Sequence, residues 1–199
     1  MVSSSDISGA ITSAARAVLI RRGYAETSIK AIAAAAGVAP EVVSSLYRNR
    51  DEVLTAALRL PFDPAGAIPQ LVGPGLDGMG ERIVRASLAL MHSDQMRNDI
   101  LALGRVASND GVSDAVALLR GGLDLVQESL VDKALVSLGV PDARMRGALI
   151  TAYVAGIMVT RYVVRVEPLA SAQDDDVVAM VAPVIQRLVD PRTPLTGAS

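Results

Sequence analysis

A glycine between two short helical patterns is the feature that most constrains how this chain folds. Thr27 and Ser28 supply N-cap oxygens to a first helix, and apolar residues follow them at helical spacing. Gly37 ends that helix, because glycine adopts the left-handed conformation at a helix end without a Cβ clash. Pro40 suits the first turn of a second helix, predicted from about residue 39 to residue 46. Two short helices joined in this way are typical of a helix-turn-helix, whose second helix can enter the major groove of DNA.

A longer series of residues surrounds this helix-turn-helix at fixed spacing. It comprises Gly23-Tyr24, Thr27-Ser28-Ile29, Ile32-Ala33, Ala36-Gly37-Val38, Tyr47, Asn49-Arg50 and Leu54. In order and spacing the series is similar to the N-terminal domain of TetR-type transcriptional regulators, and the ungapped match covers about the first 55 residues. A bare helix-turn-helix pattern is weak evidence, whereas the whole series is hard to meet by chance. The resemblance implies a dimeric DNA-binding regulator, by default a repressor, that holds a small molecule among its body helices.

The rest of the chain predicts further helices, and no alternating pattern of useful length predicts a strand. We expect a first helix at 6–22, a third helix from Asn49, and body helices at 77–92, 94–108, 111–138, 141–166 and 174–190. Gly121-Gly122 are a candidate break, since each glycine costs about 1 kcal/mol in a helix interior. Residues 60–76 contain four prolines and three glycines, which predicts an irregular connection.

The predicted fold class is therefore all-α, with a helix-turn-helix head and a helical body. A three-helix DNA-binding domain is expected at residues 1–60 and a connection at 61–76. The resemblance implies that 77–190 is a ligand-binding and dimerisation domain, and 191–199 is expected to be a tail.

The charge of the chain is divided unevenly. The whole chain carries a formal charge of −2, but residues 1–50 hold six basic and three acidic side chains. A basic head on an acidic body is an electrostatic footprint for a polyanion, and the alternative is a chance fluctuation of a few charges. The absence of cysteine and of a signal-peptide pattern at the N-terminus predicts a cytoplasmic protein.

Candidate DNA contacts lie in and around the helix-turn-helix. They are Thr27, Ser28, Lys30, Pro40, Glu41, Val42, Ser44, Ser45, Arg48 and Arg50. By resemblance, Arg50 takes the position of the family's backbone-contacting lysine, and the alternative is a solvated arginine beside two acidic residues. Glu41 could accept from a cytosine amino group or could stay exposed and uninvolved.

The second helix departs from the family pattern at two positions. Val42 and Ser44 stand where many members carry a threonine and a tyrosine that contact phosphates. This departure should weaken backbone anchoring. It leaves open an alternative, a helical ligand-binding or interaction protein whose head no longer binds DNA.

Two helices near the C-terminus carry surplus apolar surface. Residues 147–160 contain no charge, but a run of 14 residues is too short to cross a bilayer, so no membrane partner is expected. The exposed stripes predicted for a homodimer are Ala148, Ala152, Gly156 and Thr160, and Val177, Val181, Val184 and Leu188. We expect a four-helix bundle between two subunits, and the alternative is that both faces are covered within one subunit.

The body offers little chemistry besides ligand binding. His92 is the only histidine, and no residues are spaced for a metal, a cofactor or catalysis, so the chain is not expected to be an enzyme. Candidates for a small-molecule pocket are Met91, His92, Arg105, Tyr153 and Met158, although methionines at helical positions are more often core.

Overall fold

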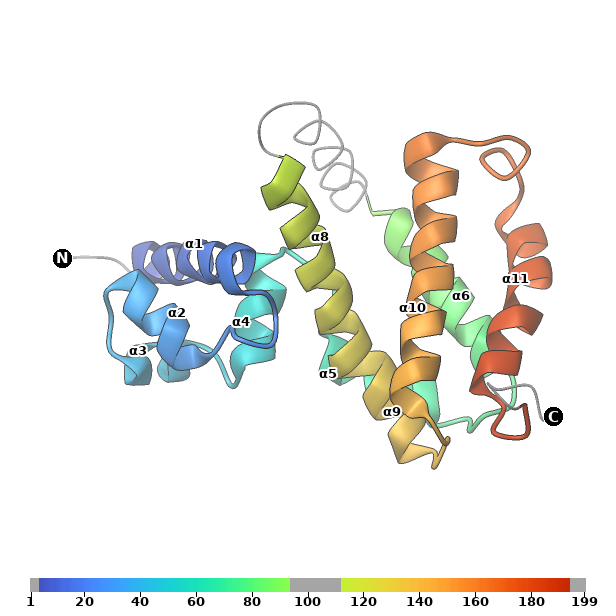
Figure 1. The fold of residues 1–199 in the computed structure, drawn as a ribbon, viewed down its shortest axis with the longest axis horizontal. Coiled ribbons are helices and arrows are strands. Elements are labelled where there is room, and N and C mark those ends of the chain that lie inside the picture. Colours follow the sequence, from blue (N-terminus) through green and yellow to red (C-terminus); the bar gives the residue numbers. More distant parts are fainter. Residues whose placement is uncertain (1–3, 94–111, 194–199) are drawn as a thin grey trace. The chain divides into compact units, whose positions relative to one another are not determined.

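The computed structural model describes residues 4–93 and 112–193, and every regular element in these ranges is helical (Figure 1). These residues divide into two compact units. Residues 4–64 and 112–126 form the first unit, and residues 65–93 and 127–193 form the second unit. The prediction of an all-α fold is confirmed.

The helix-turn-helix lies in the first unit, whose helices follow the sequence signals closely. They are α1 (Ser4–Arg22), α2 (Ile29–Ala36), α3 (Pro40–Leu46), α4 (Arg50–Ala57) and α8 (Val112–Val126). The Ser28 hydroxyl caps α2 by accepting from the Ala31 N–H at 3.2 Å, and Gly37 follows that helix with a φ of 69°. The Asn49 side chain caps α4 in the same way, at 2.9 Å from the Glu52 nitrogen.

Apolar side chains from each of these helices form the core of the first unit. The buried members are Ile11, Ala15, Leu19, Tyr24, Ile32, Ala33, Val43, Val53, Leu54, Ala57 and Leu125. The expected break at Gly121-Gly122 is wrong, because α8 continues through both glycines. A Cβ on Gly121 would lie 2.7 Å from the Leu19 Cδ2, so this glycine permits the close approach of α8 to α1 and packing offsets its intrinsic cost.

The second unit begins with a helix where an irregular connection was predicted. Helix α5 spans Pro64–Val72, so the prediction for that stretch is wrong. Pro64 occupies the first turn, where its missing N–H costs nothing, and Pro69 removes one hydrogen bond without ending the helix. Proline density alone therefore did not decide the structure, since its effect depends on the position within a turn.

The remaining elements of the second unit include two π-helical segments. The elements are α6 (Met79–Met91), η1 (Gln127–Val131), α9 (Asp132–Ser137), α10 (Ala143–Met158), η2 (Val159–Val164) and α11 (Asp174–Val189). The predicted body helix at 111–138 corresponds to α8, η1 and α9 in succession, and the one at 141–166 corresponds to α10 and η2. The body helix expected at 94–108 lies outside the described residues.

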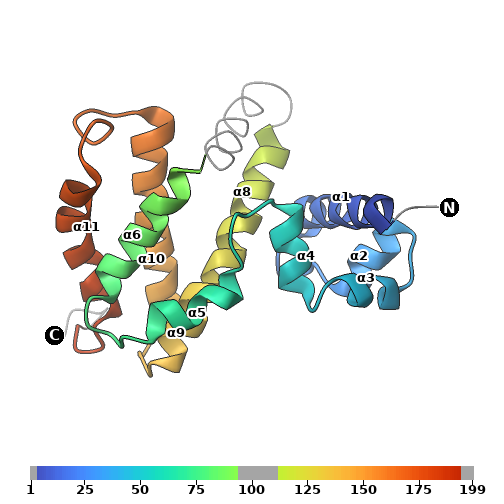
Figure 2. The ribbon, with the colours of Figure 1, turned by 180° about the vertical axis from the view of Figure 1, so that it is seen from behind.

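Helices α6, α10 and α11 pack together, and α6 passes behind α10 in Figure 1 and in front of it in Figure 2. A Cβ on Gly80 would lie 2.4 Å from the Ala182 carbonyl oxygen, so α6 and α11 approach with backbone almost in contact. The Gln186 side chain joins the same two helices. It accepts from the Gly80 N–H at 2.8 Å and donates to the Leu76 carbonyl at 2.9 Å.

Two buried arginines hold the ends of α11. Arg146, with 1% exposure, donates to the carbonyl oxygens of Leu188 at 2.8 Å, Asp190 at 3.1 Å and Thr193 at 2.5 Å. Arg161, with 7% exposure, serves the other end through the Leu169 and Ala172 carbonyls, both at 2.6 Å, and the Asp174 carboxylate at 3.0 Å. Carbonyls in the last turn of a helix lack intrahelical partners, and Arg146 supplies a donor to one of them, whereas Arg161 binds carbonyls of the segment that leads into α11.

Candidate nucleic-acid interface

The second helix of the helix-turn-helix, α3, is anchored by one side and exposed on the other. Val43 is fully buried in the core of the first unit. Glu41, Ser44 and Ser45 are exposed, and so is Leu46 at 39%. The exposed face is therefore short and polar, which suits hydrogen bonding to base edges in a groove.

The structure places the other predicted DNA contacts unequally. Lys30, Ser28 and Arg48 are exposed, whereas Pro40, Val42 and Arg50 are partly buried. Two of the exposed hydroxyls are already engaged. Ser28 caps α2, and the Ser45 hydroxyl donates to the Val42 carbonyl at 2.8 Å.

Thr27, a predicted DNA contact, is buried in the first unit. Its side chain is fully buried, and its hydroxyl donates to the Gly23 carbonyl at 2.7 Å. The sequence placed Thr27 and Ser28 together as cap residues, but only Ser28 takes the N-cap position of α2. Thr27 instead fixes the turn that leads from α1 into the helix-turn-helix.

Arg50 is held against the protein at the first residue of α4. Its guanidinium lies 4.2 Å from the centre of the Tyr24 ring, and its Nε donates to Asp51 Oδ1 at 3.2 Å. The Tyr24 hydroxyl donates to the same carboxylate oxygen at 2.9 Å. Arg50 therefore stabilises the junction of α1 with α4. A contact with a DNA phosphate would be a second role, beside this structural one.

Arg48 lies two residues after α3 and is 73% exposed. Its Nε lies 3.2 Å from Glu52 Oε2, its backbone N–H donates to the same oxygen at 2.6 Å, and its Nη2 lies 3.4 Å from Asp63 Oδ2. The hydrogen bonds from Arg48 lower the pKa of Glu52, and the hydrogen bond to Glu52 raises the pKa of Arg48. Both partners are therefore ionised at neutral pH.

The charge of the head is smaller than the count over residues 1–50 suggests. Residues 1–64 contain seven basic and six acidic side chains, a formal charge of +1. The acids beyond residue 50 are Asp51, Glu52 and Asp63, which pair with Arg50 and Arg48. The spacing of Arg48 and Glu52 at i and i+4 could have revealed one pair from sequence, but the Asp63 contact depends on the fold.

Tyr47 is a further member of this region that the sequence analysis did not assign to the interface. It follows α3 directly, and its hydroxyl lies 2.8 Å from the Ser8 hydroxyl on α1. The contact ties the end of α3 to α1. No pattern in the sequence links two hydroxyls that are 39 residues apart.

The residues predicted for a ligand pocket differ in their burial. Met91 is buried in the core of the second unit, and Met158 packs against that core. Tyr153 is 48% exposed, and His92 lies at the surface with its Nε2 3.1 Å from Asp174. Arg105 lies outside the described residues.

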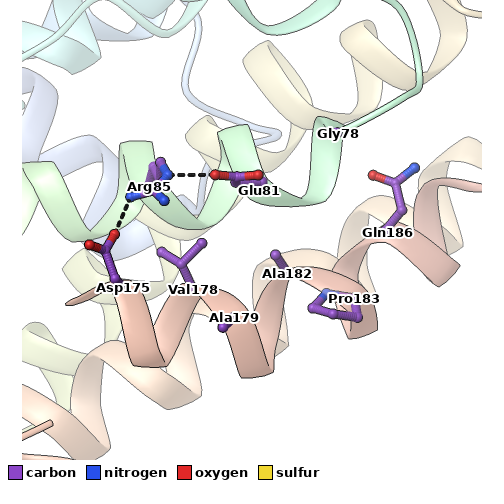
Figure 3. A pocket seen from close by; sticks show the side chains of 9 residues that line it. All are labelled: Gly78, Glu81, Arg85, Asp175, Val178, Ala179, Ala182, Pro183 and Gln186. Atoms are coloured by element: carbon purple, nitrogen blue, oxygen red, sulfur yellow. Dashed lines mark hydrogen bonds and ion pairs between the residues drawn. The ribbon is translucent and has the colours of Figure 1, made fainter. Parts of the chain in front are cut away.

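Two open hollows occur on the second unit. A groove of about 520 Å³ runs between α6 and α11, where Arg85 pairs with Glu81 at 2.7 Å and with Asp175 at 2.8 Å (Figure 3). A smaller hollow of about 370 Å³ is lined by His92, Arg161 and the first residues of α11. Within the described ranges, no three His, Cys, Asp or Glu side chains are grouped to hold a metal ion.

The residues predicted for a dimer interface fall on two different sides. On α10, Ala152 and Gly156 are exposed and Ala148 is partly buried, and Thr160 on η2 is also partly buried. On α11, Val177 is 2% exposed in the core of its own unit, Val181 and Leu188 pack against that core, and Val184 is partly buried. The predicted α11 stripe thus faces inward, and Met180, 70% exposed, marks the outer side of that helix.

Helix α10 and the start of η2 expose large apolar side chains that residues 4–93 and 112–193 leave uncovered. Met145 and Tyr153 on α10 are 60% and 48% exposed, and Val159 at the start of η2 is 39% exposed. The run Ala143–Val164 is long and apolar enough to cross a bilayer by length and composition, with 17% of its most apolar window buried. A single such helix is weak evidence for a membrane, and Arg146 and Arg161 tie this one to α11.

Comparisons with known proteins give consistent findings along the chain. Residues 11–57 match the family described as bacterial regulatory proteins, tetR family, and residues 77–189 match the tetracyclin repressor-like C-terminal domain. No curated protein matched.

Solved structures of three bacterial proteins are similar over most of their length. A TetR-family regulator from Streptomyces coelicolor A3 is 30% identical, with 94% of this chain and 96% of that chain covered and a TM-score of 0.44. A protein assigned to the TetR family of transcriptional regulators from Mesorhizobium loti is 13% identical, with coverage of 95% and 98% and a TM-score of 0.44. The fatty acid degradation regulator FadR from Bacillus halodurans is 19% identical, with coverage of 91% and 97% and a TM-score of 0.32.

Proposed function

This chain belongs to the TetR family of transcriptional regulators, and from that premise we propose that it is a cytoplasmic repressor that binds a palindromic operator as a homodimer and releases it when a small molecule binds. The observation that carries the proposal is the exposed polar face of α3 on a helix-turn-helix fixed by the capped α2, the left-handed Gly37 and the buried Val43. No catalytic step, metal or cofactor is part of it.

Binding of a palindromic operator by two copies requires a particular distance between their recognition helices. Two recognition helices enter successive major grooves when they are about 34–36 Å apart, or a multiple of that distance. The uncovered apolar side of α10 supports the homodimer, because exposed apolar surface of this kind is covered by a partner in a bundle. Met145, Tyr153 and Met180 replace the inward-facing Val177 stripe as the residues we assign to the interface.

Release by a small molecule rests on the family alone. A ligand that favours another spacing of the two heads lowers DNA affinity, and a coupling of about 1–3 kcal/mol corresponds to a change of about 5- to 150-fold. We assign no residue to the effector site, since the five candidates are dispersed among core, surface and the undescribed stretch.

A second candidate is a regulator-like protein whose head does not bind DNA. The observation that favours it is the pairing of Arg48 and Arg50, the arginines next to α3, with three carboxylates. The dependence of DNA binding on salt concentration distinguishes the two candidates. A head with several phosphate contacts loses DNA affinity steeply as salt rises, whereas a head that does not bind DNA has no affinity to lose.

The test is a selection of genomic fragments by the purified protein at about 100 mM salt. We expect recovery of an inverted repeat, with binding to the enriched duplex abolished by Ser44→Glu, which puts a carboxylate on the exposed face of α3. The matched control is Ser113→Glu on α8, which makes the same change at an exposed position outside the helix-turn-helix. A folded dimer that enriches no sequence would refute the proposal.

A further inference from the structure

Arg48, a predicted DNA contact, is paired with the carboxylates of Glu52 and Asp63. These carboxylates and a DNA phosphate would compete for its guanidinium. We propose that Arg48, Glu52 and Asp63 form an intramolecular latch, in which Asp63 holds the Arg48 guanidinium until a DNA phosphate replaces it. This inference rests on the proposed function, and it concerns how the same interface is regulated. It predicts that the free protein is restrained from binding DNA by one of its own carboxylates.

The two carboxylates play different parts because their contacts differ. Glu52 accepts both the backbone N–H of Arg48, at 2.6 Å, and its Nε, at 3.2 Å. Glu52 therefore fixes the loop between α3 and α4 as well as the side chain. The contact of Arg48 with Asp63 is made through the Nη2, at 3.4 Å, and the Asp63 side chain is 47% exposed. The Asp63 contact is the longer and more solvated one, so it is the one that a phosphate exchanges.

The exchange is chemically conservative. A guanidinium presents several N–H donors in a planar fork, and carboxylate and phosphate oxygens accept from it with similar geometry. Arg48 can thus keep its Nε on Glu52 while its Nη2 passes from Asp63 to a phosphate. Exposed ion pairs are weak, and breaking one corresponds to a change in affinity of about two- to fivefold.

The position of Asp63 gives the latch a regulatory consequence. Asp63 immediately precedes α5, and the second unit begins two residues later. A phosphate on Arg48 removes the Arg48 contact of Asp63, and any change that strengthens that contact keeps Arg48 engaged. By thermodynamic linkage the two effects are equal in size, so DNA binding and the Arg48–Asp63 contact weaken each other.

The test is a double-mutant cycle read by fluorescence anisotropy on the labelled duplex recovered in the selection. Asp63→Asn removes the charge and keeps a side-chain oxygen before α5, and Asp63→Ser is a second variant with the same property. Glu26→Gln is the matched control, because it removes one exposed acidic charge from the same unit away from Arg48. Each change is made in the wild-type and in the Arg48→Gln background.

We expect Asp63→Asn to raise affinity by about two- to fivefold, more than Glu26→Gln does, and the excess to vanish in the Arg48→Gln background. Equal effects of the two substitutions, or an excess that persists without Arg48, would overturn the latch. Circular dichroism melting of each variant establishes that it is folded. Wild-type protein that binds no duplex would instead refute the proposed function itself, so the two failures are distinguishable.

Discussion

Replacing Arg146 with methionine is the sharpest test of what holds the second unit together. The Arg146 side chain is buried, and its three hydrogen bonds reach the carbonyls of the last turn of α11 and of the residues that follow it. Methionine fills a similar elongated space without donors. The substitution thus leaves the packing volume nearly unchanged and removes one hydrogen bond from each of three carbonyl oxygens.

The expected loss of unfolding free energy follows from these contacts. Hydrogen bonds from a charged donor contribute about 1.5–3 kcal/mol each, but part of that sum is offset because a buried guanidinium no longer has to be desolvated. We expect Arg146→Met to cost about 2–4 kcal/mol, and a chain of this size loses roughly 2–4 °C in Tm per kcal/mol. Arg146→Lys should retain only part of the stability, since an ammonium cannot reach three carbonyls as a fork does.

The assay is urea unfolding followed by far-ultraviolet circular dichroism, because the chain has no tryptophan. All variants are compared at one protein concentration, since association would make apparent stability concentration-dependent. Arg144→Met is the matched control. Its side chain is 85% exposed and lies 4.0 Å from Glu128, so it should change stability by less than about 0.5 kcal/mol. Equal losses in the two methionine variants would refute the reasoning.

Three further predictions test packing, burial and assembly. Gly121→Ala should destabilise the first unit, because a Cβ there meets the buried Leu19 at a cost of about 1–3 kcal/mol that exceeds the gain in helix propensity. Gly122→Ala should stabilise the same unit by up to about 1 kcal/mol, because a Cβ there makes only an ordinary contact with Leu58 at 3.9 Å. Thermal melting compares the two variants, and the same sign for both would contradict the close approach. Burial raises the pKa of Asp132, so the folded protein holds this proton more tightly than the unfolded chain, and the free energy of unfolding falls as pH rises through the pKa of the folded state. Asp132→Asn should therefore be more stable than wild type at pH 7 and lose this advantage below about pH 4. An advantage that does not depend on pH would contradict the raised pKa of Asp132. Tyr153→Glu, on the exposed side of α10, should give a monomer mass by light scattering where the wild type gives a dimer, and an unchanged dimer would move the interface elsewhere.

The parts of the fold that were predictable depend on signals a few residues long. Ser28 and Gly37 bound α2 by their own conformational preferences, and Asn49 starts α4 for the same reason. Gly121 was misread because its partner, Leu19, is about a hundred residues away in sequence. A propensity argument could not anticipate that contact.

The candidate site was harder to predict because side-chain orientation is set by the rest of the fold. Thr27 and Ser28 are equally good cap residues, and only the geometry of the preceding turn buries one and exposes the other. Val177 belongs to an apolar stripe that satisfies a helical period, but the period does not say whether the stripe meets its own core or a second subunit. The partners of Arg48 and Arg50 likewise include residues 15 and 26 positions away.

The two arginines at the ends of α11 also shape how the molecule meets a polyanion. Arg146 and Arg161 count toward the formal charge, but their guanidinium groups are buried against main-chain oxygens and one carboxylate. The solvent-facing surface of the second unit is therefore more acidic than its composition implies. In the proposed regulator, this surface disfavours a duplex, whereas the exposed Lys30 and Arg48 lie on the first unit, so long-range electrostatics favours an approach to DNA by the first unit.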